Sequence, residues 1–290
     1  MSLKIYVDGA FVPQNEAKIS VFDHGFLYGD GVFEGIRAYN GRVLKLNEHI
    51  ERLYDSAKAI MLDIGIPKEK MSDIVLESLR INKLTDSYIR LIVSRGVGDL
   101  GLDPRKCAKP SIICIAAHIA VYPPELYDRG LEIVTSTVRR NIPEALNPRI
   151  KSLNYLNNIL AKIEANRQGA PEAIMLNQDG LVAECTADNI FIIKNGKIST
   201  PPAYMGALGG ITKDTVVEIA KSLNKNVCEE VFSRYEVYTA DEMFLTGTGA
   251  EVIPVTSVDG RKIGDGTVGK LTKELITAYK DYANKNGVTI

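Results

Sequence analysis

Four features of the sequence carry residues that could bind an anion or move a proton. Lys151 stands in RIKSLNYL, ahead of an expected helix, and Arg52 lies within NEHIERLYDS. Gly209–Thr212 leads into another expected helix, whose first N–H groups and dipole favour phosphate. Thr246–Ala250 (TGTGA) follows an apolar strand, and its small residues permit a turn whose N–H groups converge. Two anion-binding turns and an arginine indicate a phosphorylated cofactor.

Each feature also has an ordinary structural interpretation. A lysine before a helix is usually a solvated charge, and Arg52 lies off the apolar stripe of its expected helix, which is typical of a surface residue. The two glycine-containing segments are usually plain loops that lead into or out of an element. Residue type alone therefore leaves both interpretations open.

Composition excludes several classes of function. The chain has 290 residues, 45% hydrophobic and 24% charged, with a net charge of −1 and no block of basic residues. We expect neither nucleic acid nor a membrane as a partner. The three histidines and four cysteines show no metal-ligand or CxxC spacing, so we expect no metal and a reduced, cytoplasmic protein. The cysteines are Cys107, Cys114, Cys185 and Cys228.

The elements that must position these residues alternate irregularly between strand and helix. Asn40-Gly41 predicts a hairpin turn between strands 32–39 and 43–46, Asn47 is a candidate N-cap, and Pro67 should open the next helix. The other expected strands are 5–7, 88–93, 112–121, 131–138, 173–176, 189–193 and 243–246. The other expected helices are 155–167, 212–223 and 271–283.

A break at 121–130, with Pro123-Pro124 and Gly130, divides the pattern into two domains. We expect a small N-terminal α/β domain over 1–120, an interdomain loop over 121–130, and a larger cofactor-binding domain over 131–290. The fold class is α+β. The chain lacks a GxGxxG after a strand, so a dinucleotide-binding sheet is not expected.

Seven strings, in order over nearly the whole chain, resemble the branched-chain amino acid aminotransferases of the fold-type IV pyridoxal-phosphate enzymes. They are YGDGVFEGIRAYNG, NEHIERL, YIRLIVSRGVGDLGLDP, KSLNYLNN, AECTADNIF, GGITKD and FLTGTGAE. The resemblance implies the two-domain architecture of the D-amino acid aminotransferase-like fold. It also implies pyridoxal 5'-phosphate as the cofactor, and amino transfer between leucine, isoleucine or valine and 2-oxoglutarate by a ping-pong mechanism.

The resemblance assigns roles toward the cofactor. Lys151 would bond covalently to it and then move the substrate proton, as general base and then acid. Glu184 would keep the ring nitrogen protonated, and Tyr155 would hydrogen-bond the phenolic oxygen. The phosphate would be held by Arg52, Ile211, Thr212 and Thr248.

The resemblance also assigns the substrate pocket. Its members would be Tyr28, Phe33, Gly35, Arg37, Tyr88, Arg90, Tyr122, Thr248 and Gly249, with Leu100 and Leu102 supplied by the other subunit of a homodimer or higher homo-oligomer. Related D-specific enzymes carry an Arg-x-His pair in the loop that here reads GVGDLGLDP. Its leucines cannot hold a carboxylate but can line an apolar pocket. D-amino acid or mixed specificity (aromatic donors or (R)-amines), a lyase, and a non-catalytic cofactor binder remain the alternatives.

Overall fold

The computed structural model describes residues 3–119 and 121–290, which form two compact units. Of the described residues, unit 1 comprises 3–119, 150–155 and 283–290, and unit 2 comprises 121–149 and 156–282. The first segment of unit 1 ends next to the break expected at 121–130. Residues 150–155 and 283–290, which the sequence analysis placed in the second domain, belong to unit 1.

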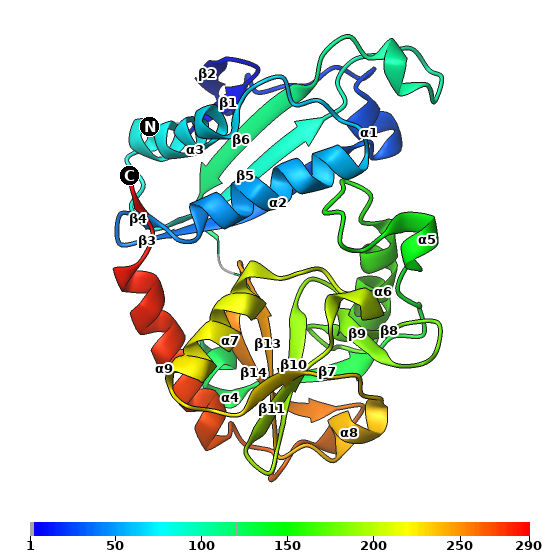
Figure 1. Ribbon diagram of the computed structural model, residues 1–290, viewed down its shortest axis with the longest axis vertical. Coiled ribbons are helices and arrows are strands. Elements are labelled where there is room, and N and C mark those ends of the chain that lie inside the picture. The colour runs from blue at the N-terminus through cyan, green and yellow to red at the C-terminus, as the bar shows by residue number, and fades with distance from the viewer. Residues whose placement is uncertain (1–2, 120) are drawn as a thin grey trace. The chain divides into compact units, whose positions relative to one another are not determined.

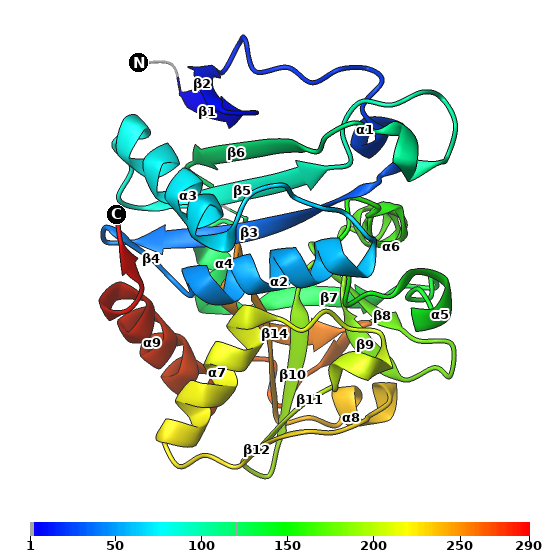
Figure 2. The same cartoon turned by 45° about the horizontal axis from the view of Figure 1, so that its top comes forward.

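Unit 1 is built on an antiparallel sheet of order β16-β4-β3-β5-β6-β1-β2. Its strands are β1 (Lys4–Val7), β2 (Ala10–Pro13), β3 (Gly31–Tyr39), β4 (Arg42–Val43), β5 (Ser87–Ser94), β6 (Ser111–Ala117) and β16 (Val288–Thr289). Its helices are α1 (His24–Tyr28), α2 (Leu46–Ala59), α3 (Lys68–Asn82) and the 3-10 turn η1 (Pro104–Lys106). Figures 1 and 2 show α2 and α3 lying along this sheet.

The core of unit 1 lies between the sheet and these two helices. Leu53 of α2, Met71 of α3 and Ile36 of β3 are completely buried in one apolar cluster. The apolar residues of α2 recur at three- and four-residue spacing, which places them on the face turned to the sheet. This packing fixes α2, and with it Arg52, against β3.

Unit 2 contains a mixed sheet of order β12-β11-β10-β13-β14-β7-β8-β9, with β15 paired to β14. Its strands are β7 (Leu131–Thr135), β8 (Ala173–Leu176), β9 (Val182–Cys185), β10 (Asn189–Lys194), β11 (Lys197–Thr200), β12 (Val227–Glu229), β13 (Glu242–Gly247), β14 (Glu251–Val258) and β15 (Arg261–Lys262). Its helices are α4 (Glu125–Arg129), α5 (Pro143–Leu146), α6 (Leu156–Arg167), the 3-10 turn η2 (Ala203–Met205), α7 (Ile211–Ser222), α8 (Arg234–Tyr238) and most of α9 (Lys270–Lys285).

Several expectations about elements need correction. The helix after the first hairpin begins at Leu46 behind Lys45, whose backbone is left-handed, so Asn47 is not its N-cap. The expected strand 43–46 is only the two residues of β4, because the chain turns into α2 at once. The expected strand 131–138 ends at Thr135. The expected strand 112–121 is β6, which ends at Ala117, and residue 120 lies outside the described residues.

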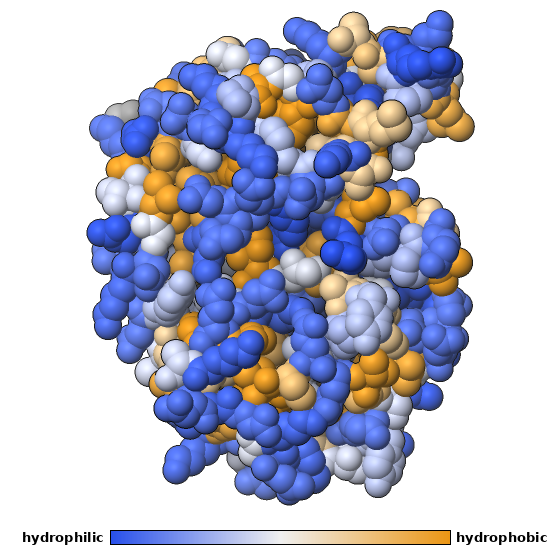
Figure 3. Space-filling view, in the orientation of Figure 1, coloured by the Kyte–Doolittle hydropathy of each residue, from blue (hydrophilic) through white to orange (hydrophobic). Residues whose placement is uncertain are grey.

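The surface is mixed in character. The face shown in Figure 3 is mainly hydrophilic, with separate apolar patches. Within the described residues, no helix is both long enough and apolar enough to span a lipid bilayer.

Candidate active site

Lys151 is held against β3 and α2 by its backbone. Its carbonyl accepts from the Phe33 N–H at 2.9 Å, and its own N–H donates to Ser56 Oγ at 3.2 Å. The side chain is half-buried, with Nζ 3.3 Å from Tyr155 Oη and 4.6 Å from the centre of the Phe33 ring. The Phe33 and Tyr155 rings themselves meet edge to face at 5.1 Å. The lysine amine therefore lies between an aromatic face and a phenol, within one unit.

Arg52 is fixed by a buried carboxylate. Glu34 of β3 is completely buried and accepts from Arg52 Nε at 2.7 Å, Arg52 Nη2 at 2.8 Å and His49 Nδ1 at 2.7 Å. Burial alone would raise the pKa of Glu34, but the charge of Arg52 and the hydrogen bonds from His49 and Arg52 outweigh it and lower the pKa to about 2. Burial lowers the pKa of His49. Arg52, expected on the surface from its place in the helix pattern, is an oriented and largely buried cation.

A second arginine lies on the same sheet. Arg90 of β5 has its guanidinium 4.6 Å from the Phe33 ring centre, and its Nη2 donates to Tyr88 Oη at 3.1 Å. Its Nε is buried and has no hydrogen-bond partner among the described residues. A Cβ on Gly35 would lie 2.1 Å from Tyr88 Oη, so only glycine leaves room for the tyrosine. Phe33, Gly35, Tyr88 and Arg90 are thus brought together on β3 and β5.

The loop after β5 exposes two leucines. Leu100 and Leu102 are 68% and 78% exposed. Tyr28 Oη donates to the Leu100 carbonyl at 2.5 Å, which ties the loop to the end of α1. Arg37 lies two residues beyond Gly35 on β3, with its guanidinium 5.2 Å from the Tyr39 ring centre. In unit 1, Tyr28 is close to Leu100, whereas Arg37 is directed to Tyr39.

Glu184 of β9, in unit 2, is a buried carboxylate with two partners. Its Oε1 accepts from Arg140 Nε at 2.8 Å, and its Oε2 accepts from the Leu208 N–H at 2.8 Å. Arg140 is in turn oriented by Asn157, whose Oδ1 accepts from Nη1 at 2.9 Å. Sequence patterns gave no sign of Arg140, because it lies in a loop without a repeating motif.

The two expected anion-binding turns meet in unit 2. The N-cap of α7 is Gly210, which contributes no side-chain cap, so the first N–H groups at Ile211 and Thr212 have no acceptor from the helix itself. Thr248 lies in the turn between β13 and β14, and its Oγ1 is 3.4 Å from Thr212 Oγ1. Gly249 follows in the same turn. This arrangement suits a phosphate, because a helix N-terminus and two hydroxyls are directed to one place.

Tyr122 is buried beside the carboxyl group of Asp188, whose place in the sequence carries no local signal of a role. Its Oη lies 3.4 Å from Asp188 Oδ2. Burial raises the pKa of Asp188 to about 7, with a further contribution from the charge of Glu172. Burial and the neighbouring Asp188 likewise raise the pKa of Tyr122 far above its usual value.

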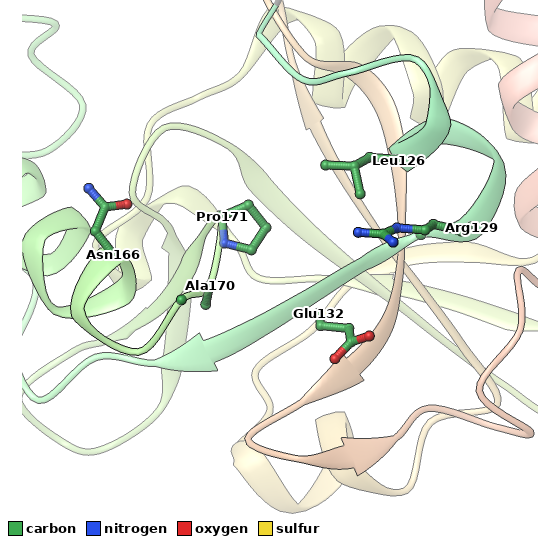
Figure 4. A pocket seen from close by; sticks show the side chains of 8 residues that line it. Leu126, Arg129, Glu132, Asn166, Ala170 and Pro171 are labelled. Carbon is green, nitrogen blue, oxygen red and sulfur yellow. The ribbon is translucent and has the colours of Figure 1, made fainter.

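A surface pocket of about 500 Å³ lies elsewhere on unit 2. It is lined by Leu126, Arg129, Gly130, Glu132, Asn166, Gly169, Ala170 and Pro171. Figure 4 shows Leu126 and Arg129 on one side of it, with Asn166, Ala170 and Pro171 on the other. None of the expected site residues lines this pocket, so it is separate from the candidate active site despite its volume.

Comparison with known proteins gives consistent results. Residues 31–258 match the family model described as amino-transferase class IV. A Methanocaldococcus jannaschii protein, provisionally named a branched-chain-amino-acid aminotransferase, is 55% identical over 288 residues, with 99% of each chain covered. The branched-chain amino acid aminotransferase structure from Escherichia coli has a TM-score of 0.95 and 34% identity, covering 99% of this chain and 96% of that one. The T.th. branched-chain amino acid aminotransferase with pyridoxamine 5'-phosphate has a TM-score of 0.94 and 36% identity, covering 98% of this chain and 95% of that one.

Proposed function

Because the chain belongs to the class IV aminotransferase family, we propose that it is a pyridoxal 5'-phosphate-dependent branched-chain-amino-acid transaminase. It exchanges the amino group between leucine, isoleucine or valine and 2-oxoglutarate by a ping-pong mechanism. The observation that carries this proposal is Lys151, whose amine lies 3.3 Å from the Tyr155 phenol and over the Phe33 ring. Such a lysine can bond to a cofactor carbonyl and afterwards act as a base.

The residues fit the phosphate of this cofactor. The first turn of α7 lacks a side-chain cap and has Thr248 beside it, which favours an anion. Arg52 adds a fixed charge, because Glu34 holds two of its nitrogens in place. In this proposal the phosphate is bound by Arg52, Ile211, Thr212 and Thr248.

The residues also fit the ring and the proton transfer. When bound, the cofactor supplies an electron-withdrawing ring that stabilises negative charge at the substrate Cα. Glu184 would keep a proton on the ring nitrogen, and its two protein partners, Arg140 and the Leu208 N–H, orient the carboxyl group for that contact. Tyr155 donates to the phenolic oxygen. With cofactor and substrate bound, Lys151 would take the proton from the substrate Cα and, as the resulting ammonium, donate it to the cofactor carbon beside it.

The substrate is gripped by groups of two kinds. Arg90 has a buried Nε without a partner among the described residues, which suits a carboxylate oxygen, and Tyr88 fixes the other end of the guanidinium. The turn at Thr248-Gly249 binds the carboxylate of the substrate through its N–H groups. The remaining members of the proposed pocket are Tyr28, Phe33, Gly35, Arg37, Tyr122, and Leu100 and Leu102 of a second copy of the chain.

We also propose a homodimer. Leu100 and Leu102 project from unit 1, and α6 of unit 2 exposes a stripe at three- and four-residue spacing. The stripe consists of Leu156, Ile159, Leu160 and Ile163, which are 45–60% exposed. Apolar residues gathered in this way are typical of surfaces covered by a partner.

A cytoplasmic location is a further proposal, in keeping with four cysteines that are free thiols.

The test begins with the visible absorbance of the purified protein after addition of pyridoxal 5'-phosphate. We expect the band of lysine-bound cofactor, its conversion by L-leucine, and amino transfer to 2-oxoglutarate with parallel double-reciprocal lines. Lys151→Ala should remove the band, whereas Lys280→Ala, on the exposed side of α9, should not. Conversion by D-alanine alone would reassign the substrate class. The absence of any band from the wild-type protein would refute the proposed function.

A further inference from the structure

Asp188 and Asn189 form a buried polar pair where β10 begins. They are 5% and 7% exposed. The Cys185 N–H donates to the Asp188 carbonyl at 2.8 Å and closes the tight connection from β9. Asn189 is paired with Thr246 in the β10–β13 ladder. The pair is therefore adjacent to the strand end from which the turn at Thr248 departs.

Asn189 contacts the segment that precedes α7. Its Nδ2 donates to the Leu208 carbonyl at 3.0 Å. A Cβ on Gly210 would lie only 1.8 Å from Asn189 Oδ1, so the carboxamide oxygen is packed directly against the glycine backbone. Leu208 is thus held at both ends of its backbone, because its N–H donates to Glu184. The carboxamide of Asn189 therefore positions the backbone that leads into α7.

Asp188 contacts the other anion-binding turn. A Cβ on Gly247 would lie 2.0 Å from Asp188 Oδ1, so the carboxyl group fills the space that glycine leaves. Its Oδ2 lies 3.4 Å from the Tyr122 hydroxyl. Gly247 directly precedes Thr248 and Gly249. One carboxyl group therefore touches both the base of the turn and a proposed substrate-pocket tyrosine.

We propose that these neighbours are positioning residues with separate tasks: Asn189 sets the first turn of α7 for the cofactor phosphate, and Asp188 sets Tyr122 and the turn at 247–249 for the substrate. The inference rests on the proposed function. Hydrogen bonds with buried polar groups specify one geometry, because leaving a buried group unpaired is costly. A purely structural pair would stabilise the unit without distinguishing cofactor from substrate.

The experiment compares Asn189→Ala and Asp188→Asn with two controls on exposed residues of unit 2, Asn166→Ala and Asp179→Asn. For each protein, the dissociation constant of pyridoxal 5'-phosphate is measured by absorbance titration of the cofactor-free chain. KM and kcat for L-leucine are measured at saturating cofactor, and Tm is recorded. Asn189→Ala should weaken cofactor binding at least tenfold and change KM less than twofold. Asp188→Asn should raise KM at least fivefold and weaken cofactor binding no more than threefold, the smaller effect on the cofactor arising because the turn at 247–249 also carries Thr248 of the proposed phosphate site.

Two results would overturn the inference. One is a lowered Tm in both variants with binding and KM no different from the controls. The other is an equal change of cofactor binding and KM in both, which would remove the separation of tasks. If Asn189→Ala does not fold, Asn189→Ser replaces it, since the hydroxyl remains polar but is too short to reach Leu208. Loss of cofactor binding by the wild-type protein would instead refute the proposed function, so the two failures are distinguishable.

Discussion

At the scale of single residues, each unit places a buried carboxylate against an arginine. Glu34 binds Arg52 in unit 1, and Glu184 binds Arg140 in unit 2, with donor–acceptor distances of 2.7–2.8 Å. An isolated buried charge is costly, so burial of these carboxylates and arginines is tolerated only because each pair has good hydrogen-bond geometry. The consequence for function is that the charges are oriented before any ligand binds, and binding then requires little reorganisation.

Replacing Glu34 by Gln should weaken cofactor binding and destabilise the protein. The amide cannot neutralise Arg52, whose side chain is only 15% exposed, and breaking such a pair costs about 3–5 kcal/mol. We expect at least a tenfold weaker affinity for pyridoxal 5'-phosphate and a lower Tm. Glu48→Gln is the control: it alters the ion pair of Lys45 with the half-exposed Glu48 at the start of α2 and should cost about 1 kcal/mol or less. Equal cofactor affinity in E34Q and wild type would contradict the assigned role of Glu34.

The stability that Glu34 contributes should depend on pH. The pKa of Glu34 is lowered in the folded state to about 2, from an ordinary value of 4.5. The stabilisation is therefore complete above pH 4.5 and is lost as the pH falls toward 2. Chemical denaturation between about pH 6 and about pH 3 should show wild type losing stability faster than Glu34→Gln. Parallel curves for the two proteins would contradict the lowered pKa.

The four cysteines should differ in their reaction with a thiol reagent. Burial raises the pKa of Cys114 to about 12 and that of Cys185 well above its usual value, so neither forms an accessible thiolate at about pH 8. Ellman's reagent should label no more than Cys107 and Cys228 in the native protein and all four in denaturant. A native protein that reacts rapidly at three or more thiols would show that one of the buried strands opens.

What could be predicted from the sequence depended on whether a residue acts alone or through a partner. Lys151 stands in a recognisable string, and the structure places its amine next to Tyr155. The partners Glu34, Arg140 and Asn189 were not identified, because their importance arises from strand register and loop packing that no local spacing reveals. The resemblance predicts which residues bind a ligand, and the fold was needed to find the residues that orient them.

At the scale of elements, turn chemistry was the most dependable local signal. Asn40-Gly41 joins β3 to β4 with both residues at positive φ, as a tight hairpin requires, so this prediction is confirmed. The start of α2 was wrong because Lys45 adopts a left-handed backbone and the helix begins directly after it, at Leu46. Tertiary packing of α2 on the sheet supplied the stability that a cap would have given.

Alanine substitutions at two glycines of unit 1 should distinguish the cost of backbone strain from the cost of steric overlap. Gly9 and Gly96 both have positive φ, at 101° and 90°. A Cβ on Gly9 would meet nothing within 4 Å, whereas one on Gly96 would lie 1.9 Å from the Lys109 carbonyl oxygen. Gly9→Ala should cost about 1–2 kcal/mol from conformation alone, and Gly96→Ala about 1–3 kcal/mol more. Equal free energies of unfolding for the two variants would show that the backbone at Lys109 moves aside for the new Cβ without loss of stability.

At the scale of the whole molecule, the residues of the proposed site are divided among distant parts of the chain. Lys151 and Tyr155 belong to unit 1 although they lie beyond its first segment, and Glu184 and Thr248 belong to unit 2. The sequence predicted a break near residue 121. It did not predict that 150–155 pack with unit 1, because so short a segment shows no change of composition. Two backbone hydrogen bonds explain it, since the Phe33 N–H donates to the Lys151 carbonyl and the Leu153 N–H donates to the Gly31 carbonyl, which joins 150–155 to β3.

The exposed stripe of α6 predicts how copies of the chain associate. Charges at Ile159 and Ile163 would be buried without partners in an interface formed by this stripe, at a cost of several kcal/mol. We expect the wild-type chain to sediment as a dimer at micromolar concentration, and Ile159→Glu with Ile163→Glu to dissociate at least a hundredfold more readily. Tyr235→Glu, at an exposed aromatic position on α8, is the control and should leave the dimer intact. Because Leu100 and Leu102 are proposed to complete the pocket of a second copy, dissociation should also raise KM for L-leucine. A wild-type monomer that transaminates leucine at full rate would refute both the interface and the shared pocket.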